Sequence, residues 1–176
     1  MNFLLGIAVQ LLSSLFLIRL LLQAVQADFY NPLSQTVFKL SAPVVEPLSR
    51  LLPSIGRLNC AALAAALGVR FGYFLFAGAS PVVALLQSSY GLLVLLMDLY
   101  FWAIFIIIIA SWVGNGSNPL LRVIAQLVEP YMGVFRRFIP PLGMLDLSPM
   151  AAILVLISVR DRLLPMLFNA LQGALL

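Results

Sequence analysis

Long apolar runs separated by short polar stretches make up most of this chain. The runs lie at about residues 3–26, 59–79, 90–113 and 147–169, and each is long enough to cross a hydrocarbon layer of roughly 30 Å as a helix. The sequence therefore predicts an all-α, polytopic membrane protein with four transmembrane helices. A cleaved signal peptide is the alternative for the first run, but Arg19 stands at its far end rather than before it.

The stretches 31–56 and 118–143 have a different pattern, because their apolar residues follow a helical period and are interrupted by proline. Leu33, Val37 and Leu40 fall on one helical face. Each stretch is too short and too punctuated to span a bilayer. Both are predicted to be helix-break-helix elements that lie in the headgroup plane, with the breaks at Pro43 and Pro130.

The second of these stretches repeats the first, 87 positions downstream and without gaps. Most of the matched residues fix backbone shape: an asparagine that can cap a helix, a proline in its first turn, and later prolines and a glycine. The pairs are Asn31/Asn118, Pro32/Pro119, Pro43/Pro130, Pro53/Pro140 and Gly56/Gly143, with Arg50/Arg137 between them. We therefore expect two tandem repeats, at 1–80 and 88–176, each a span, an interfacial element and a span, so that the copies run parallel.

Composition agrees with a membrane protein and disfavours an enzyme. The chain has 63% apolar residues, 9% charged residues and a mean hydropathy of +1.11, which leave too little polar surface for a soluble domain. It has no histidine, one cysteine (Cys60) and no serine with a plausible base nearby in the sequence. We expect a non-enzymatic protein with no cofactor, no metal site and no catalytic residue.

The basic residues cluster in the two repeated stretches. A formal net charge of +4 is carried mainly by Lys39, Arg50, Arg57, Arg122, Arg136 and Arg137. We expect these six to contact lipid headgroups and, by the positive-inside rule, to face the cytoplasm, which puts both termini in the periplasm. Direct binding of nucleic acid is disfavoured, because no soluble basic face is visible.

The charged residues inside the predicted spans lead to the most specific hypothesis. Arg70, Asp98 and Asp161 fall roughly 18 to 22 Å from the cytoplasmic side at the helical rise per residue. Arg70 paired with Asp98 or Asp161 would either lock the helices or line an ion path, and snorkelling to headgroups is the plain alternative. Arg19 is expected to snorkel, with bonds to repeat-loop carbonyls or to Asp28 as the alternative.

Two further features of the spans bear on packing. Ala64, Gly68 and Gly72 stand four apart, a small-residue stripe that is expected to pack helices within or between protomers. An uncharged stretch that starts at Pro81 and includes Ser88 is expected to form the turn on the opposite side, with a short helix of its own as a variant.

The blocks RLLLQAVQADFYNPLSQ, PVVEPLSRLLPSIG and EPYMGVFRRFIPPLGMLDLSPM together resemble the YggT family of bacterial membrane proteins, also called YlmG. The resemblance covers nearly the whole chain, including its doubling. It implies a small plasma-membrane protein linked to osmotic or ionic stress tolerance and to envelope or division-related organisation, and it brings no reaction. Chloroplast relatives are implicated in thylakoid cytochrome assembly and nucleoid distribution. Departures are Asn59 against Asp146, Ser49 against Arg136 and the triplet Arg160 to Arg162.

Two hypotheses of different class follow from the sequence. The first is an inner-membrane scaffold or assembly factor whose interfacial helices organise lipid or partner proteins, with a homo-oligomer or other membrane proteins as partners. The second is an oligomeric ion or osmolyte channel, which needs a continuous polar stripe through the membrane.

Overall fold

The computed structural model describes residues 3–113, 118–139 and 146–175, and within these the regular elements are helices apart from one isolated bridge between Ile55 and Leu58. The prediction of an all-α chain is confirmed. In order the elements are α1 (Phe3–Ala24), α2 (Pro32–Leu51), α3 (Cys60–Phe76), α4 (Pro81–Val113), α5 (Pro119–Phe138), α6 (Ser148–Ser158), the π-helical turn η1 (Val159–Leu163) and α7 (Leu164–Leu175).

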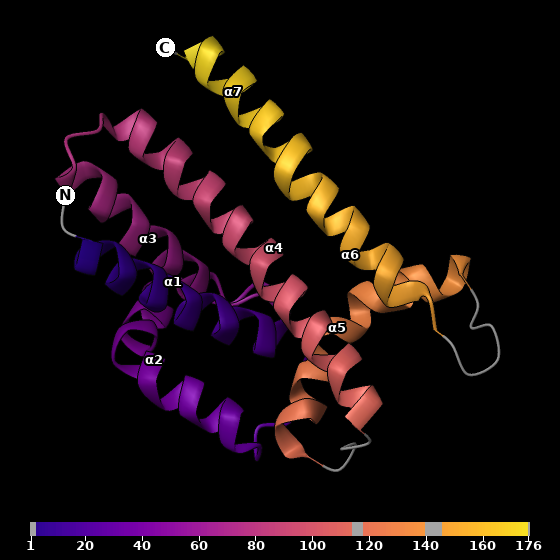
Figure 1. The fold of residues 1–176 in the computed structure, drawn as a ribbon. Coiled ribbons are helices and arrows are strands. Elements are labelled where there is room, and N and C mark those ends of the chain that lie inside the picture. Colours follow the sequence, from indigo (N-terminus) through magenta and orange to yellow (C-terminus); the bar gives the residue numbers. More distant parts are fainter. Residues whose placement is uncertain (1–2, 114–117, 140–145, 176) are drawn as a thin grey trace.

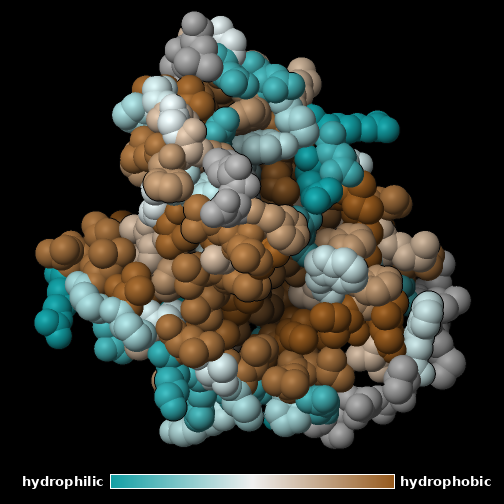
Figure 2. Space-filling view, turned by 60° about the vertical axis from the view of Figure 1, so that its left-hand side comes forward, coloured by the Kyte–Doolittle hydropathy of each residue, from teal (hydrophilic) through white to brown (hydrophobic). Residues whose placement is uncertain are grey.

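Two of the described helices are long and apolar enough to cross a bilayer by length and composition, at Phe3–Ala24 and Pro81–Trp112. The apolar helix α3 is shorter, at 17 residues. Large apolar side chains lie on the outside of the molecule; Leu11 is 65% exposed, Trp112 82% and Met166 71%. Figure 2 shows apolar side chains gathered across the middle of one face, with most polar ones toward its edges. This surface favours association with a membrane.

The helices pack as two groups. In the first, α1, α2 and α3 share a core that includes Phe16, Val45 and Ala66 and is joined by residues of α4. In the second, α4, α5 and α6 enclose Ile104, Met132 and Ala152. In Figure 1 α6, η1 and α7 form one long rod beside α4. A third cluster, made of Leu22, Val37 and Val123, joins α1, α2 and α5 and so connects the two groups.

The matched asparagines begin α2 and α5 in the same way. The side-chain oxygen of Asn31 accepts the Leu33 N–H at 3.0 Å, and that of Asn118 accepts the Leu120 N–H at 2.9 Å, with proline as the first helical residue in both. Asn31 also donates from Nδ2 to the carbonyl oxygen of Pro119 at 2.6 Å. The two caps therefore touch, and the start of one helix holds the start of the other.

The helix breaks expected at Pro43 and Pro130 are wrong. Helix α2 runs unbroken through Pro43 and Pro47, and α5 runs through Pro130. An internal proline removes one N–H donor and crowds the carbonyl four residues earlier. This cost is offset by burial, since Val45 between the two prolines is fully buried against α1 and α3. Pro53 follows the end of α2 and Gly56 has φ +61, as a turn there requires; Pro140 and Gly143 lie outside the described residues.

Two boundaries also differ from expectation. The stretch expected as a turn from Pro81 is the first part of α4, and the turn lies just before it, where Gly78 has φ +88. Pro81 suits the first position of a helix, and the Ser88 hydroxyl is satisfied inside the helix by the Ala84 carbonyl. The last rod continues through the charged triplet to Leu175, whereas the expected span ended near residue 169.

The close contact between α1 and α3 uses a different set of small residues from the one expected. Ala61, Ala62, Ala65 and Ala66 are buried there, and Ser13 of α1 donates to the Ala66 carbonyl at 3.5 Å. Gly68 and Gly72 of the predicted stripe are exposed, with nothing within 4 Å of where a Cβ would stand, and Ala64 is only half-buried. The expectation that this stripe packs helices within the protomer is wrong, because the alanine face of α3 is the one that α1 covers.

Candidate functional site: a polar cluster between α4 and the last helix

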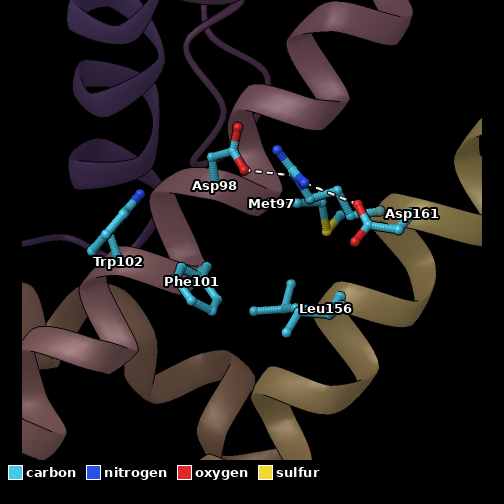
Figure 3. A pocket seen from close by; sticks show the side chains of 8 residues that line it. Met97, Asp98, Phe101, Trp102, Leu156 and Asp161 are labelled. Carbon is cyan, nitrogen blue, oxygen red and sulfur yellow. Dashed lines mark hydrogen bonds and ion pairs between the residues drawn. The ribbon is translucent and has the colours of Figure 1, made fainter.

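Three charged side chains meet between α4 and the rod formed by α6, η1 and α7. Arg160 Nε lies 2.7 Å from Asp98 Oδ1, and Arg160 Nη1 donates to Asp161 Oδ1 at 2.9 Å. Figure 3 shows both carboxylates turned toward the guanidinium between them. The Nε contact is short, but the N–H does not point along it, so we describe it as an ion pair rather than an aligned hydrogen bond. The cluster carries one net negative charge.

The π turn explains how a charged triplet fits into a helix. Pro165 follows the turn and, in an α-helix, its ring would crowd the carbonyl of Asp161. The chain widens here instead, and the Leu164 N–H bonds the carbonyl of Val159, five residues earlier. This insertion sets the direction in which Arg160 leaves the helix and places it against Asp98.

The cluster lines a cavity of about 310 Å³. Its other walls are apolar and aromatic, and include Met97, Phe101 and Trp102 of α4 and Leu156 and Ile157 of α6. Within the described residues no group of three or more His, Cys, Asp or Glu side chains is placed to hold a metal ion. The cavity is therefore a partly charged, partly aromatic recess whose charges are already in contact with one another.

Arg70 does not join this cluster, so the expected pair with Asp98 or Asp161 is wrong. Its Nη1 donates to Gln10 Oε1 of α1 at 3.0 Å. The guanidinium rests against Gly91 of α4, where a Cβ would overlap Nη2 and stand 3.0 Å from Cζ. Counting residues along the chain grouped Arg70 with Asp98 and Asp161, but the direction of its side chain around the helix separates it from them.

The two groups of helices carry similar polar cross-links at nearly matched positions. With the repeat offset of 87, Asp98 corresponds to Leu11 and Arg160 to Tyr73. The first group uses Gln10, adjacent to Leu11, and Arg70, one turn before Tyr73. Each group thus has an arginine on its second long helix bonded to a polar side chain on its first.

Arg19 is the most buried charge, at 7% exposed, so the expectation of snorkelling is wrong and the alternative of loop contacts is found. Its Nη1 donates to Ser41 Oγ at 2.9 Å and to the Phe38 carbonyl at 3.3 Å, and its guanidinium carbon lies 5.0 Å from the centre of the Phe38 ring. Helix α2 lies over this part of α1 and supplies these acceptors, which draw the side chain inward.

All six predicted headgroup residues are exposed, and five of them have no carboxylate of the described residues within ion-pair distance: Lys39, Arg50, Arg57, Arg122 and Arg137. Arg136 is exposed too, but it is occupied by carboxylates, Glu129 at 2.8 Å and Asp146 at 3.2 Å. Partial desolvation lowers the pKa of Arg136, but these carboxylates outweigh it and raise the pKa above its ordinary value. The Arg136 side chain is therefore engaged in two ion pairs within the second group of helices.

Asn59 and Asp146, which differ between the repeats, both bind a backbone N–H at the start of the next helix, but one residue apart relative to that helix. The Asn59 side chain accepts the Ala62 N–H at 2.9 Å at the start of α3, and Asp146 Oδ1 accepts the Ser148 N–H at 2.9 Å at the start of α6. Partial burial raises the pKa of Asp146, but hydrogen bonds from Ser148 and the charge of Arg136 outweigh it and hold the pKa below its ordinary value. Asn59 is the N-cap of α3, whereas Asp146 lies one residue before the N-cap Leu147 of α6 and holds the first helical N–H.

Sequence reasoning missed Arg160 as the centre of the cluster, and missed Gln10 and Gly91 as the surroundings of Arg70. Pro165 was an available signal for the first, because a proline placed soon after a charged triplet in a helix favours a local change of geometry. No comparable signal marks Gln10 or Gly91, whose roles depend on which helices are neighbours.

Comparison with known proteins identifies the family. The family described as CCB3/YggT matches residues 1–80 and 86–167. The Escherichia coli (strain K12) protein described as uncharacterized protein YggT is 36% identical over 163 residues, which cover 89% of this chain and 85% of that protein. A Pseudomonas aeruginosa protein is 37% identical over 162 residues, covering 84% of this chain and 81% of its own.

A plant relative matches a shorter part of the chain. The Arabidopsis thaliana protein described as YlmG homolog protein 2, chloroplastic, is 37% identical over 60 residues, which cover 34% of this chain and 24% of that protein. No solved structure matches the chain. The family match over nearly the whole length, together with these relatives, shows that the chain belongs to the CCB3/YggT family.

Proposed function

We propose that this protein is a non-enzymatic scaffold of the bacterial inner membrane, built from two tandem parallel repeats at residues 1–80 and 88–176. In this proposal α1, α3, α4 and the rod of α6, η1 and α7 are the four spans, and α2 and α5 lie along the membrane surface. The family match falls on two consecutive stretches, which supports the doubling. At about 1.5 Å per residue α3 is roughly 25 Å long, and local thinning of the bilayer would accommodate it.

The distribution of charge supports an orientation. Lys39, Arg50 and Arg57 are exposed between the first two proposed spans, and Arg122 and Arg137 between the last two. Basic residues favour the cytoplasmic side, so we place α2 and α5 there and both termini in the periplasm. The cytoplasmic leaflet carries anionic lipid, which these five cations would attract.

The observation that carries the scaffold proposal is the coupling of the two amphipathic helices. Asn31 of α2 bonds Pro119 of α5, and Val37 and Val123 share one buried cluster, so the two basic helices are held together. The buried faces of α2 and α5 pack inside the protein, and their exposed cations can contact lipid or an acidic partner. Apolar side chains on the outside of the long helices leave surface for neighbouring membrane proteins.

Lipid retention tests this proposal. Each cation near an anionic surface contributes about 1 kcal/mol, so Arg50→Gln combined with Arg137→Gln should lose about 2 kcal/mol, or roughly thirtyfold in binding of phosphatidylglycerol. Arg162→Gln, in η1 near the middle of the last proposed span and outside α2 and α5, is the matched control and should retain lipid. Retention equal to wild type in the double variant would remove the lipid-organising role.

The cavity beside Asp98, Arg160 and Asp161 favours one alternative function, an oligomeric ion or osmolyte channel. Charged groups within apolar helices often mark an ion path. Here the three charges are paired with one another, which is what a structural lock requires. Cation uptake by liposomes that is lost in Asp98→Asn would favour the channel, and uptake no greater than in empty liposomes would favour the scaffold.

The same variant separates the two functions in cells. The family resemblance links the protein to osmotic or ionic stress tolerance. If the scaffold carries this role, cells with Asp98→Asn should grow under salt stress as wild type does, whereas Arg50→Gln with Arg137→Gln should not.

A further inference from the structure

A second cavity, of about 360 Å³, lies where α1 ends, near α2 and the loop that leads into α3. Its lining combines polar and aromatic side chains. The polar lining residues are Gln23, Gln26, Ser54, Arg57 and Asn59, and the rings are Phe29 and Phe38. The cavity therefore sits at the end of two apolar helices, at the level where a lipid headgroup would lie if these helices cross a membrane.

The charge around this cavity is positive and unbalanced. Arg57 is the one ionised side chain in its lining, and no carboxylate of the described residues lies within ion-pair distance of it. Arg19 lies against Phe38, a ring of the same lining, and its partners are a carbonyl and a hydroxyl rather than a carboxylate. The charge of Glu46 acts on Arg19, so Arg57 is the cation of the lining that favours an anion close by.

The local backbone presents these groups to the cavity. Ile55 and Leu58 exchange two backbone hydrogen bonds, at 3.0 and 3.1 Å, across a tight turn in which Gly56 has φ +61 and Arg57 follows it. Gln26 has φ +53, a left-handed conformation that suits glycine and is strained for glutamine. This conformation ends α1, where the Ala27 N–H bonds the Leu22 carbonyl at 2.9 Å, and it leaves the Gln26 side chain in the cavity lining.

One neutral acceptor in the lining is left without a donor. The side-chain oxygen of Gln23 is buried and accepts no hydrogen bond from the described residues. A buried acceptor without a partner is costly, and a ligand that brings an N–H or O–H would remove that cost. The cavity thus offers a cation for a phosphate and, beside it, an acceptor for a donor group.

We propose that this cavity binds the headgroup of a phospholipid whose phosphodiester is followed by a hydrogen-bond donor, either ethanolamine or glycerol. Arg57 and the Ser54 hydroxyl hold the phosphate oxygens, and Gln23 accepts from the ammonium or hydroxyl group. The proposal rests on the membrane placement given under the proposed function. Phosphatidylcholine carries the same phosphate, but its quaternary ammonium has no N–H, so it binds less tightly.

Native mass spectrometry of the full chain in detergent tests this, with phosphatidylethanolamine, phosphatidylglycerol and phosphatidylcholine added at equal concentration. Arg57→Gln should bind the first two roughly tenfold more weakly, since a charge-assisted contact is lost, and Arg57→Lys should recover part of the binding. Gln23→Leu should bring them down to the level of phosphatidylcholine. Arg162→Gln, an exposed arginine of η1 outside the cavity lining, is the control and should stay within about twofold of wild type for these lipids.

Three results would overturn the assignment. These are binding by Arg57→Gln within about twofold of wild type, equal binding of phosphatidylcholine by the wild type, and displacement of lipid by soluble glycerophosphoethanolamine at equal concentration, which would make a free phosphate ester the ligand. If Arg50→Gln with Arg137→Gln retains lipid as wild type does, while Arg57→Gln still binds lipid more weakly, the scaffold proposal alone is contradicted. If the double variant loses lipid while Arg57→Gln binds lipid as wild type does, the headgroup site alone is contradicted.

Discussion

Arg160 is the centre of its cluster, so neutralising it should cost more than neutralising either carboxylate. Arg160→Met breaks both of its contacts, with Asp98 and with Asp161, and leaves two carboxylates without a counterion. Asp98→Asn breaks one contact and leaves Arg160 paired with Asp161. The structure therefore predicts an order of effects that a set of independent surface ion pairs would not give.

The magnitudes follow from exposure. The three side chains are 33–52% exposed, so each ion pair is discounted to about 1 kcal/mol, and Arg160→Met, which breaks both, should lose about 2 kcal/mol of unfolding free energy. Asp98→Asn breaks one ion pair and should lose about 1 kcal/mol. Replacing all three, as Asp98→Asn, Arg160→Met and Asp161→Asn, removes every unpaired charge and should recover most of the loss.

The assay is unfolding of the purified full chain in mixed micelles by titration with sodium dodecyl sulfate, followed by circular dichroism. The variants are compared at one pH and one ionic strength, because salt screens exposed pairs. The reasoning is refuted if Arg160→Met is no less stable than Asp98→Asn, or if the triple variant is no more stable than Arg160→Met alone.

Three further predictions use the same assay. Gly91→Ala should lose about 1 kcal/mol of unfolding free energy, because its Cβ displaces Arg70 from Gln10. Gly72→Ala, with open space around it, should be neutral or stabilising, and equal effects of the two variants would contradict the packing of Arg70 on Gly91. Asn31→Ala should lose about 2 kcal/mol and Asn118→Ala about 1, because only Asn31 both caps its helix and bonds Pro119; equal losses would argue against the contact between the caps. Asp146, whose pKa in the folded chain lies below its ordinary value, should contribute stability at neutral pH that is lost as pH falls below about 4; Asp146→Asn should remove that part of the acid dependence, and an unchanged acid limb would contradict it.

Features set by local sequence were predicted well. Asn31 with Pro32 and Asn118 with Pro119 begin helices as expected, because capping and the first-turn proline depend on adjacent residues. Pro43 and Pro130 were misjudged for the opposite reason. Whether a proline ends a helix depends on the burial around it, and the packing of Val45 against neighbouring helices is not visible in the sequence.

The candidate site was predicted in part. The depth of Asp98 and Asp161 follows from counting residues, and both do share one cluster. Their partner was misassigned because depth says nothing of direction around a helix, and the π turn changes that direction for Arg160. Arg70 faces Gln10 and Gly91 instead. The choice between the alanine and glycine stripes of α3 likewise depends on which face α1 covers.

The central claim is that two parallel repeats place both amphipathic helices on one side of the membrane. Labelling of single cysteines with a membrane-impermeant maleimide in spheroplasts, in a Cys60→Ser background, tests it most directly. Gly78→Cys, in the turn between α3 and α4, should react in intact spheroplasts, and Lys39→Cys and Arg122→Cys only after permeabilisation. Labelling of Lys39→Cys and Arg122→Cys from opposite sides, or of Gly78→Cys from the same side as Lys39→Cys, would contradict the account.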